Sequence, residues 1–195
     1  MKKLVSVLLV CMVLLSLSFV FAAQNGSLNK TRTGLGKMLR QRVHAGVYTN
    51  DAGEEFRVSE LAKNRLRLHA GNASADCDCN LTEEKEKNRT RLRVHHLNGR
   101  NTEVKIMPNV ASETALRRLR LRVCNESNNC TLELKEVAVG RNNTRAAYEL
   151  QAERHFRILW LFRVKAQIRA QVDAENGEVL SEKGPWWAFL ASEED

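Results

Sequence analysis

The residues of this chain with the clearest potential for chemistry are two closely spaced cysteines and three histidines. Cys77 and Cys79 are separated by one residue and His95 and His96 are adjacent, so both pairs could chelate a metal together with His69. On a strand, however, neighbouring histidines point to opposite faces. The chain also lacks the C-x-x-C and H-x-x-x-H spacings of metal sites. We therefore expect no metal site and no cofactor.

Paired carboxylates are the second candidates, because two such groups can perform acid–base catalysis. Glu54/Glu55 and Glu83/Glu84 form such pairs, in turn-like and highly charged surroundings. These surroundings are typical of solvated loop charge. No G-x-S-x-G, H-E-x-x-H, P-loop or dinucleotide-binding motif occurs. The sequence therefore predicts no catalytic residue and a protein that is not an enzyme.

The N-terminus has the pattern of an export signal. A basic "MKK" precedes an apolar run, Leu4–Phe21, and "FAAQ" offers a cleavage site after Ala22 or Ala23. The run is also near the shortest length that spans a membrane, so an uncleaved anchor is the alternative. In either case the rest of the chain is expected to be extracellular or on the cell surface.

Two further patterns agree with this location. Asn-x-Ser/Thr triplets are far more frequent than chance predicts, which favours N-glycosylation on exposed loops. The acceptors are Asn25, Asn29, Asn72, Asn80, Asn88, Asn125, Asn129 and Asn142. The mature chain also has an even number of cysteines, typical of disulfides in exported proteins.

The spacing of these cysteines favours one pairing and leaves another open. Cys124 and Cys130 flank a short polar loop, so we expect a bridge between them. Cys77 and Cys79 are only two apart. A bridge between them would be strained and easily reduced, and could serve as a redox element.

Charge limits the class of partner. The formal net charge is +8, and removing Lys2 and Lys3 with the leader leaves +6. For an exported protein, acidic glycans, surface polymers or anionic headgroups are better candidates than nucleic acid, although a basic surface also serves solubility. A membrane partner is expected only if the N-terminal segment stays uncleaved.

The first part of the mature chain is predicted to be a tether followed by a β module. Residues 24–42 are polar and glycine-bearing, with a short helix near 37–42. Residues 43–108 alternate apolar and polar side chains, with turns at "NDAGE" and at the Asn-Gly pair of "NGRN". They predict an antiparallel, β-rich module. We assign no structure to the charged segment 71–88.

The second part, residues 109–195, is predicted to contain one helix and an antiparallel meander. "ASETALRRLRL" predicts a short amphipathic helix capped by Ser112. Strand patterns cover 131–137, 146–154 and 163–173, and the apolar link 155–162 suggests a wide or bulged hairpin end. The expected fold class is therefore α+β.

The end of the last strand carries a recognisable motif. Val172, Asp173, Ala174, Asn176, Gly177, Glu178 and Val179 form "VDAENGEV". This pattern resembles the final hairpin of PepSY-like domains, in which Asp173, Asn176 and Gly177 would form the turn. The strings "KIMPNVASETALRRL", "CTLELKEV" and "PWWAFLA" also resemble exported proteins of archaea.

The PepSY resemblance implies a helix plus three-stranded meander and a role like that of protease-propeptide modules. We therefore expect a non-catalytic binding or inhibitory module whose partner is a protein or an envelope polymer. The alternative is a structural envelope-associated protein that binds an acidic surface polymer. Trp186, Trp187 and Phe189 either cover the open face of the sheet or form a docking surface.

Overall fold

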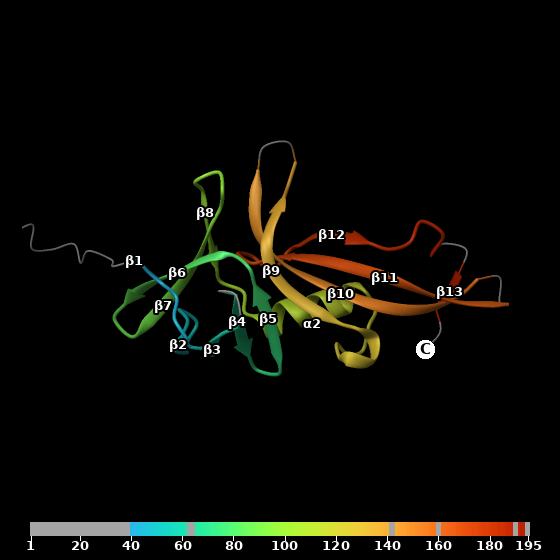
Figure 1. The fold of residues 1–195 in the computed structure, drawn as a ribbon, viewed down its shortest axis with the longest axis horizontal. Helices are drawn as coiled ribbons and strands as arrows, with labels where there is room; N and C mark the ends of the chain where they lie inside the picture. Colours follow the sequence, from blue (N-terminus) through green and yellow to red (C-terminus); the bar gives the residue numbers. More distant parts are fainter. Residues whose placement is uncertain (1–39, 62–64, 141–142, 159–160, 189–190, 194–195) are drawn as a thin grey trace, which may run out of the picture. The chain divides into compact units, whose positions relative to one another are not determined.

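The computed structural model describes residues 40–61, 65–140, 143–158, 161–188 and 191–193. Among these residues there is one α-helix, and most of the rest forms β-strands in two sheets (Figure 1). The expected α+β class is therefore wrong, because a single helix accompanies a β-rich fold. The expected helix and antiparallel meander are both present, but strands form most of the described residues.

The two sheets differ in size. The small sheet has the order β1-β6-β7-β8: β1 (Arg40–Arg42), β6 (Asn80–Glu86), β7 (Arg89–His95) and β8 (Asn101–Val104). The large sheet has the order β12-β11-β10-β9-β5-β4-β3-β2: β12 (Val179–Lys183), β11 (Phe162–Asp173), β10 (Thr144–Ile158), β9 (Thr131–Ala138), β5 (Ala73–Cys77), β4 (Leu66–Ala70), β3 (Glu55–Glu60) and β2 (Gly46–Thr49). A short strand, β13 (Ala191–Glu193), pairs with β10.

Strands from both parts of the chain share the large sheet. Their junction is a short parallel pairing between β5 and β9, at Asp76 with Glu133 and Cys77 with Leu134. The other pairings of this sheet are antiparallel. The large sheet therefore spans the boundary that the sequence suggests between residues 43–108 and residues 109–195.

The charged segment 71–88, for which the sequence suggests no structure, contains two strands, β5 and β6. Its glutamates Glu83 and Glu84 are only 3% and 5% exposed, so the interpretation of solvated loop charge is wrong for this pair. They lie within β6, where Arg93 approaches Glu84 at 3.0 Å and Lys85 approaches Glu83 at 3.3 Å. By contrast, Glu54 and Glu55 are exposed, as expected.

The helix, α2 (Pro108–Arg118), starts earlier than expected. Proline occupies its first turn and Met107 is the N-cap, so Ser112 lies inside the helix, buried, and does not cap it. The local reason is that the fixed φ of proline suits the first helical position. The short helix expected near 37–42 is also wrong where it is described, because Arg40–Arg42 forms β1.

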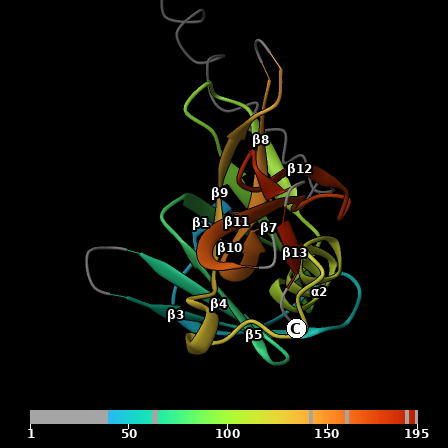
Figure 2. The ribbon, with the colours of Figure 1, turned by 90° about the vertical axis from the view of Figure 1, so that its right-hand side faces the viewer.

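The core joins the apolar face of the large sheet, which packs against α2, with buried apolar side chains of the small sheet. Leu66, Cys77, Leu134, Tyr148 and Val172 are neighbours across five strands. On the helix Ala111 and Ala115 are fully buried, and α2 contacts β4, β5, β10, β11 and β12 (Figure 2). The phenol of Tyr148 donates a hydrogen bond to the carbonyl of Ile106 at 2.9 Å, and burial raises the pKa of that phenol.

The turn after β11 has the geometry that its motif suggests. Gly177 has φ 76°, the backbone amide of Glu175 donates to the Asp173 carboxylate at 2.8 Å, and β12 follows. The sequence did not indicate that Asp173 would be only 1% exposed and ion-paired with Arg145 at 2.7 Å. This ion pair ties the turn to the beginning of β10.

Candidate functional site

A continuous row of polar side chains crosses the face of the large sheet opposite the core. The row runs over seven strands, and each member is the register partner of the next. We call it the polar row: Ser59, Arg67, Asp76, Glu133, Glu149, Gln171 and Ser181. It arises because polar residues alternate with apolar ones on each of these strands.

Neighbouring side chains link the members of the polar row. Arg67 binds the carboxylate of Asp76 through both Nε and Nη2, and Arg65 lies 3.8 Å from Asp76 and 4.0 Å from Glu133. On the other side of the junction, Gln171 donates to Glu149, and Ser181 donates to Gln171 at 2.7 Å. The row is thus linked by hydrogen bonds on either side of the junction, and by ion pairs of Glu133 with Arg65 and Lys135 across it.

Glu149 is the most buried member, at 3% exposure. Its carboxylate accepts hydrogen bonds at 2.6 Å each from Lys135, Gln151 and Gln171. Burial alone would raise the pKa of Glu149, but these three donors and the charge of Lys135 together hold it below its usual value. The group therefore stays ionised at neutral pH.

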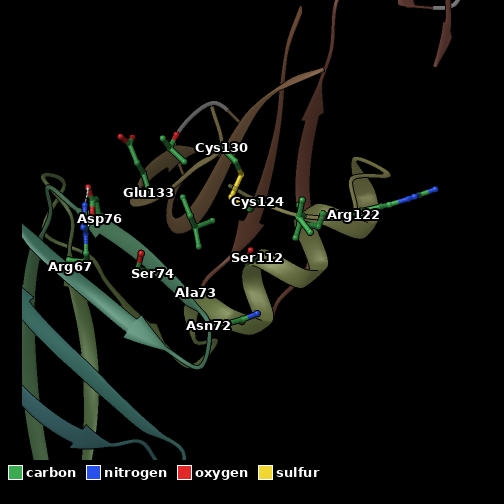
Figure 3. A pocket seen from close by; sticks show the side chains of 14 residues that line it. Arg67, Asn72, Ala73, Ser74, Asp76, Ser112, Arg122, Cys124, Cys130 and Glu133 are labelled. Atoms are coloured by element: carbon green, nitrogen blue, oxygen red, sulfur yellow. Dashed lines mark hydrogen bonds and ion pairs between the residues drawn. A yellow bond between two sulfur atoms is a disulfide. The ribbon is translucent and has the colours of Figure 1, made fainter. Parts of the chain in front are cut away.

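A cleft opens beside the polar row, where β5 and β9 separate next to their two paired positions. Its volume is about 540 Å³. Arg67, Asp76 and Glu133 lie together at one end, as Figure 3 shows. Ser112 of α2 and the disulfide Cys124–Cys130 lie on the other side. The cleft is therefore a gap at the parallel junction of the sheet, bounded by helix α2 and the cystine loop.

Basic residues beside the cleft keep the carboxyl group of Asp76 in its ionised form. The hydrogen bond from Arg67, with its positive charge and that of Arg65, holds the pKa of Asp76 below its usual value despite partial burial. The same hydrogen bond raises the pKa of Arg67. The Arg67–Asp76 pair therefore places two fixed, opposite charges at one end of the cleft.

The four cysteines that the structure describes form two pairs at bonding distance, Cys77–Cys79 and Cys124–Cys130, with Cα–Cα distances of 5.2 and 5.1 Å. The expected Cys124–Cys130 bridge is confirmed. The first bridge lies where the chain leaves β5 in the large sheet and enters β6 in the small one. Disulfides of this kind indicate an oxidising, extracellular environment.

The histidines considered as metal ligands lie at separate places and have different hydroxyl partners. His69 contacts Ser59 at 3.1 Å, His95 contacts Thr82 at 2.8 Å, and His96 contacts Thr102 at 2.6 Å. In the described part of the chain, no group of three or more His, Cys, Asp or Glu side chains could hold a metal ion. His96 is instead buried between the sheets, 3.4 Å from Glu136.

The glycosylation acceptors that the structure describes are all exposed: Asn72, Asn80, Asn88, Asn125 and Asn129. Two of their triplets border the cleft, because Asn72 and Ser74 line one side and Cys130 and Thr131 line another. Asn25, Asn29 and Asn142 lie outside the described residues. Glycans on these two triplets would flank the entrance to the cleft.

The aromatic end is divided between packing and exposure. Trp187 packs edge-to-face on Phe156, with ring centroids 5.4 Å apart, whereas Trp186 is 81% exposed. Trp186 therefore does not cover the face of the sheet, which was one of the two expected roles of the aromatic end. Phe189 lies outside the described residues. None of the described helices is long and apolar enough to cross a membrane.

The sequence did not reveal the polar row or the cleft. Both depend on the parallel pairing of β5 with β9, two strands far apart in the chain. The only local signal was the alternation of polar and apolar residues on each strand. Searches of protein-family models, curated proteins and solved structures found no match to this chain.

Proposed function

We propose that the chain is a non-catalytic, exported and N-glycosylated binding module with a PepSY-like C-terminal part. Its ligand is a segment or surface of another extracellular protein, held at the cleft and the adjacent polar row. Binding to a protease, with inhibition, is one form of this function. The PepSY resemblance supports it only by analogy of fold.

The observation that carries this proposal is the polar row leading into the cleft. Its buried carboxylate, Glu149, is fully engaged by donors, and Asp76 is held by Arg67. Such paired charges keep fixed positions and so can recognise a complementary polar surface. A cleft at the edges of two strands also suits an extended segment of chain, because such segments bind along strand edges.

Basic charge favours the second candidate, a structural protein that binds an acidic envelope polymer. Arg117, Arg118, Arg120 and Arg122 are exposed around the end of α2. Arg118 forms an ion pair with Glu182 at 2.7 Å, and Arg122 lines the cleft. In this alternative, the arginines attract the polymer toward the same cleft.

The two candidates are separated by adding the purified exported protein to extracellular proteases and to isolated envelopes of the source organism. Inhibition of casein hydrolysis supports the protein-binding module. Retention on envelopes without inhibition supports the polymer-binding alternative. Catalytic turnover of any substrate, if it is lost when Asp76 or Glu149 is replaced, would contradict both candidate functions.

A matched pair of variants locates the site. Glu133→Lys reverses a charge at the cleft, and Glu86→Lys makes the same change on the small sheet. The two glutamates are comparable, since each is in an ion pair and their side chains are 41% and 49% exposed. Binding should be weakened by Glu133→Lys and unchanged by Glu86→Lys. Equal effects would show that the cleft is not the site.

A further inference from the structure

The outer part of the β10–β11 hairpin is a second surface, separate from the cleft. β9 pairs with β10 only as far as Gln151, and β12 pairs with β11 only from Arg169 onward. Beyond these positions the two long strands continue as a ribbon to Ile158 and Phe162 (Figure 1). The hairpin therefore extends past β9 and β12, and among the described strands β13 alone pairs with it there, at Phe156–Ile158.

Large apolar side chains are exposed at this end. Leu161 is 77% exposed, Phe162 is 64% exposed and Trp186 is 81% exposed. Trp186 belongs to this end because its neighbour Trp187 packs on Phe156 of the hairpin, and Ala191 pairs with Ile158. Exposed residues of this kind, gathered at one place, mark an interaction surface.

The strands behind the apolar end are basic. Residues 152–169 include five arginines or lysines, and Glu153 is their one acidic residue. Arg163 directly follows Phe162 and pairs in register with Arg157, and Lys165 follows two residues later. At about 3.3 Å per residue, these cations lie roughly 3–10 Å behind Phe162.

We propose that this hairpin end docks on the surface of a bilayer that carries anionic headgroups. Leu161, Phe162 and Trp186 enter the boundary between headgroups and acyl chains, and the arginines and lysine behind them meet the headgroups. Apolar and aromatic side chains backed by cations are the usual combination for interfacial binding. A narrow, protruding ribbon suits a deformable bilayer better than the surface of a folded protein.

The end of the chain is compatible with shallow docking. β13 runs antiparallel to β10, with Ala191 opposite Ile158 and Glu193 opposite Phe156. Within the described residues, β13 is thus directed away from the hairpin end as it runs from Ala191 to Glu193. This inference does not depend on the cleft, nor on whether the N-terminal apolar segment is retained.

The test uses vesicles of phosphatidylcholine alone and of phosphatidylcholine mixed with phosphatidylglycerol in equal parts. The chain has three tryptophans, Trp160, Trp186 and Trp187, all within or beside this hairpin in the sequence. Their fluorescence therefore reports this end, even if another segment also binds lipid. We expect a blue shift and quenching by nitroxide-labelled lipid with the anionic vesicles, weakened by added salt.

Variants decide whether the apolar end and the cations cause the binding. Leu161→Ser combined with Phe162→Ser should weaken partitioning at least ~10-fold, since two exposed apolar side chains lose their burial. The control, Leu97→Ser, removes a fully exposed leucine from the β7–β8 turn and should have no effect. Lys165→Glu should weaken binding to anionic vesicles, and Arg89→Glu on the small sheet should not.

Three outcomes would overturn the proposal. The first is no spectral change with either kind of vesicle. The second is an equal response of the double variant and Leu97→Ser. The third is self-association without lipid that the double variant abolishes, which would identify a second copy of the chain as the occupant. Circular dichroism of each variant checks that it is folded.

Discussion

Replacing Glu149 with glutamine is the most informative perturbation of the polar row. The carboxylate accepts three hydrogen bonds at 2.6 Å and is almost fully buried. An amide of the same shape keeps one acceptor oxygen and turns an NH2 group toward a donor. At least one of Lys135, Gln151 and Gln171 then loses its partner, and the ion pair with Lys135 becomes an ordinary hydrogen bond.

We expect Glu149→Gln to lower the free energy of unfolding by about 2–4 kcal/mol, from weakened charged hydrogen bonds and an unsatisfied donor. For a domain of this size the melting temperature should fall by roughly 4–16 °C. Thermal unfolding followed by circular dichroism measures this change. The control is Glu133→Gln in the same row, whose side chain is 41% exposed and should cost less than about 1 kcal/mol. Equal melting temperatures for Glu149→Gln and the native protein would show that the hydrogen bonds of the Glu149 carboxylate do not stabilise the fold.

The pH dependence supplies an independent check. The pKa of Glu149 is lower in the folded protein than its usual value. The stabilisation from its charged form is therefore complete above the usual carboxyl pKa, and is lost as the pH falls through the lowered folded pKa. The difference in stability between the native protein and Glu149→Gln should shrink in acid. A difference that stays constant down to strongly acidic pH would contradict this assignment.

Three further predictions concern the turn, the aromatic end and the glycans. Gly177→Val should lower the free energy of unfolding by roughly 1–3 kcal/mol, because φ is 76° and the new Cβ would lie 3.4 Å from Ile106. Gly177→Asn should cost less, because asparagine adopts positive φ more readily. Equal denaturation midpoints for the two variants would exclude backbone strain as the cause. Trp186→Ala should leave the melting temperature nearly unchanged, whereas Trp187→Ala should lower it, because only Trp187 packs on the hairpin; the reverse order would be inconsistent with this packing. Glycopeptide mass spectrometry should find lower occupancy at Asn129 than at Asn72, Asn80, Asn88 and Asn142, because Asn129 precedes a cystine and its loop is tied once the bridge closes. Full occupancy at Asn129 together with no glycan at Asn72, Asn80, Asn88 and Asn142 would contradict this order.

Local patterns in the sequence predicted much of the strand arrangement. The Asn-Gly pair at 98–99 gives the β7–β8 turn, with φ 80° at Gly99, and the alternation from Val164 to Asp173 gives β11. Both depend on residues close together in the chain. The class was wrong because a single helix accompanies a β-rich fold. The charged segment 71–88 adds two strands to it, and Glu83 and Glu84 of β6 are paired with Lys85 and Arg93.

The site could not be predicted in the same way. Asp76 and Glu133 meet only because β5 and β9 pair in parallel, and nothing near either residue in the sequence specifies that pairing. Similarly, the burial of Glu149 depends on donors from β9 and β11 as well as from its own strand. Alternation predicts which side chains share a face, but it does not predict which strands are neighbours.

Binding of an extracellular ligand at the cleft between β5 and β9 should protect the backbone amides of these two strands. Hydrogen exchange of the exported protein can be measured alone and with envelope fragments and extracellular proteases of the source organism. We expect slower exchange in residues 73–77 and 131–134, with no change in β7 and β8. Unchanged exchange at β5 and β9, or protection confined to the small sheet, would contradict it.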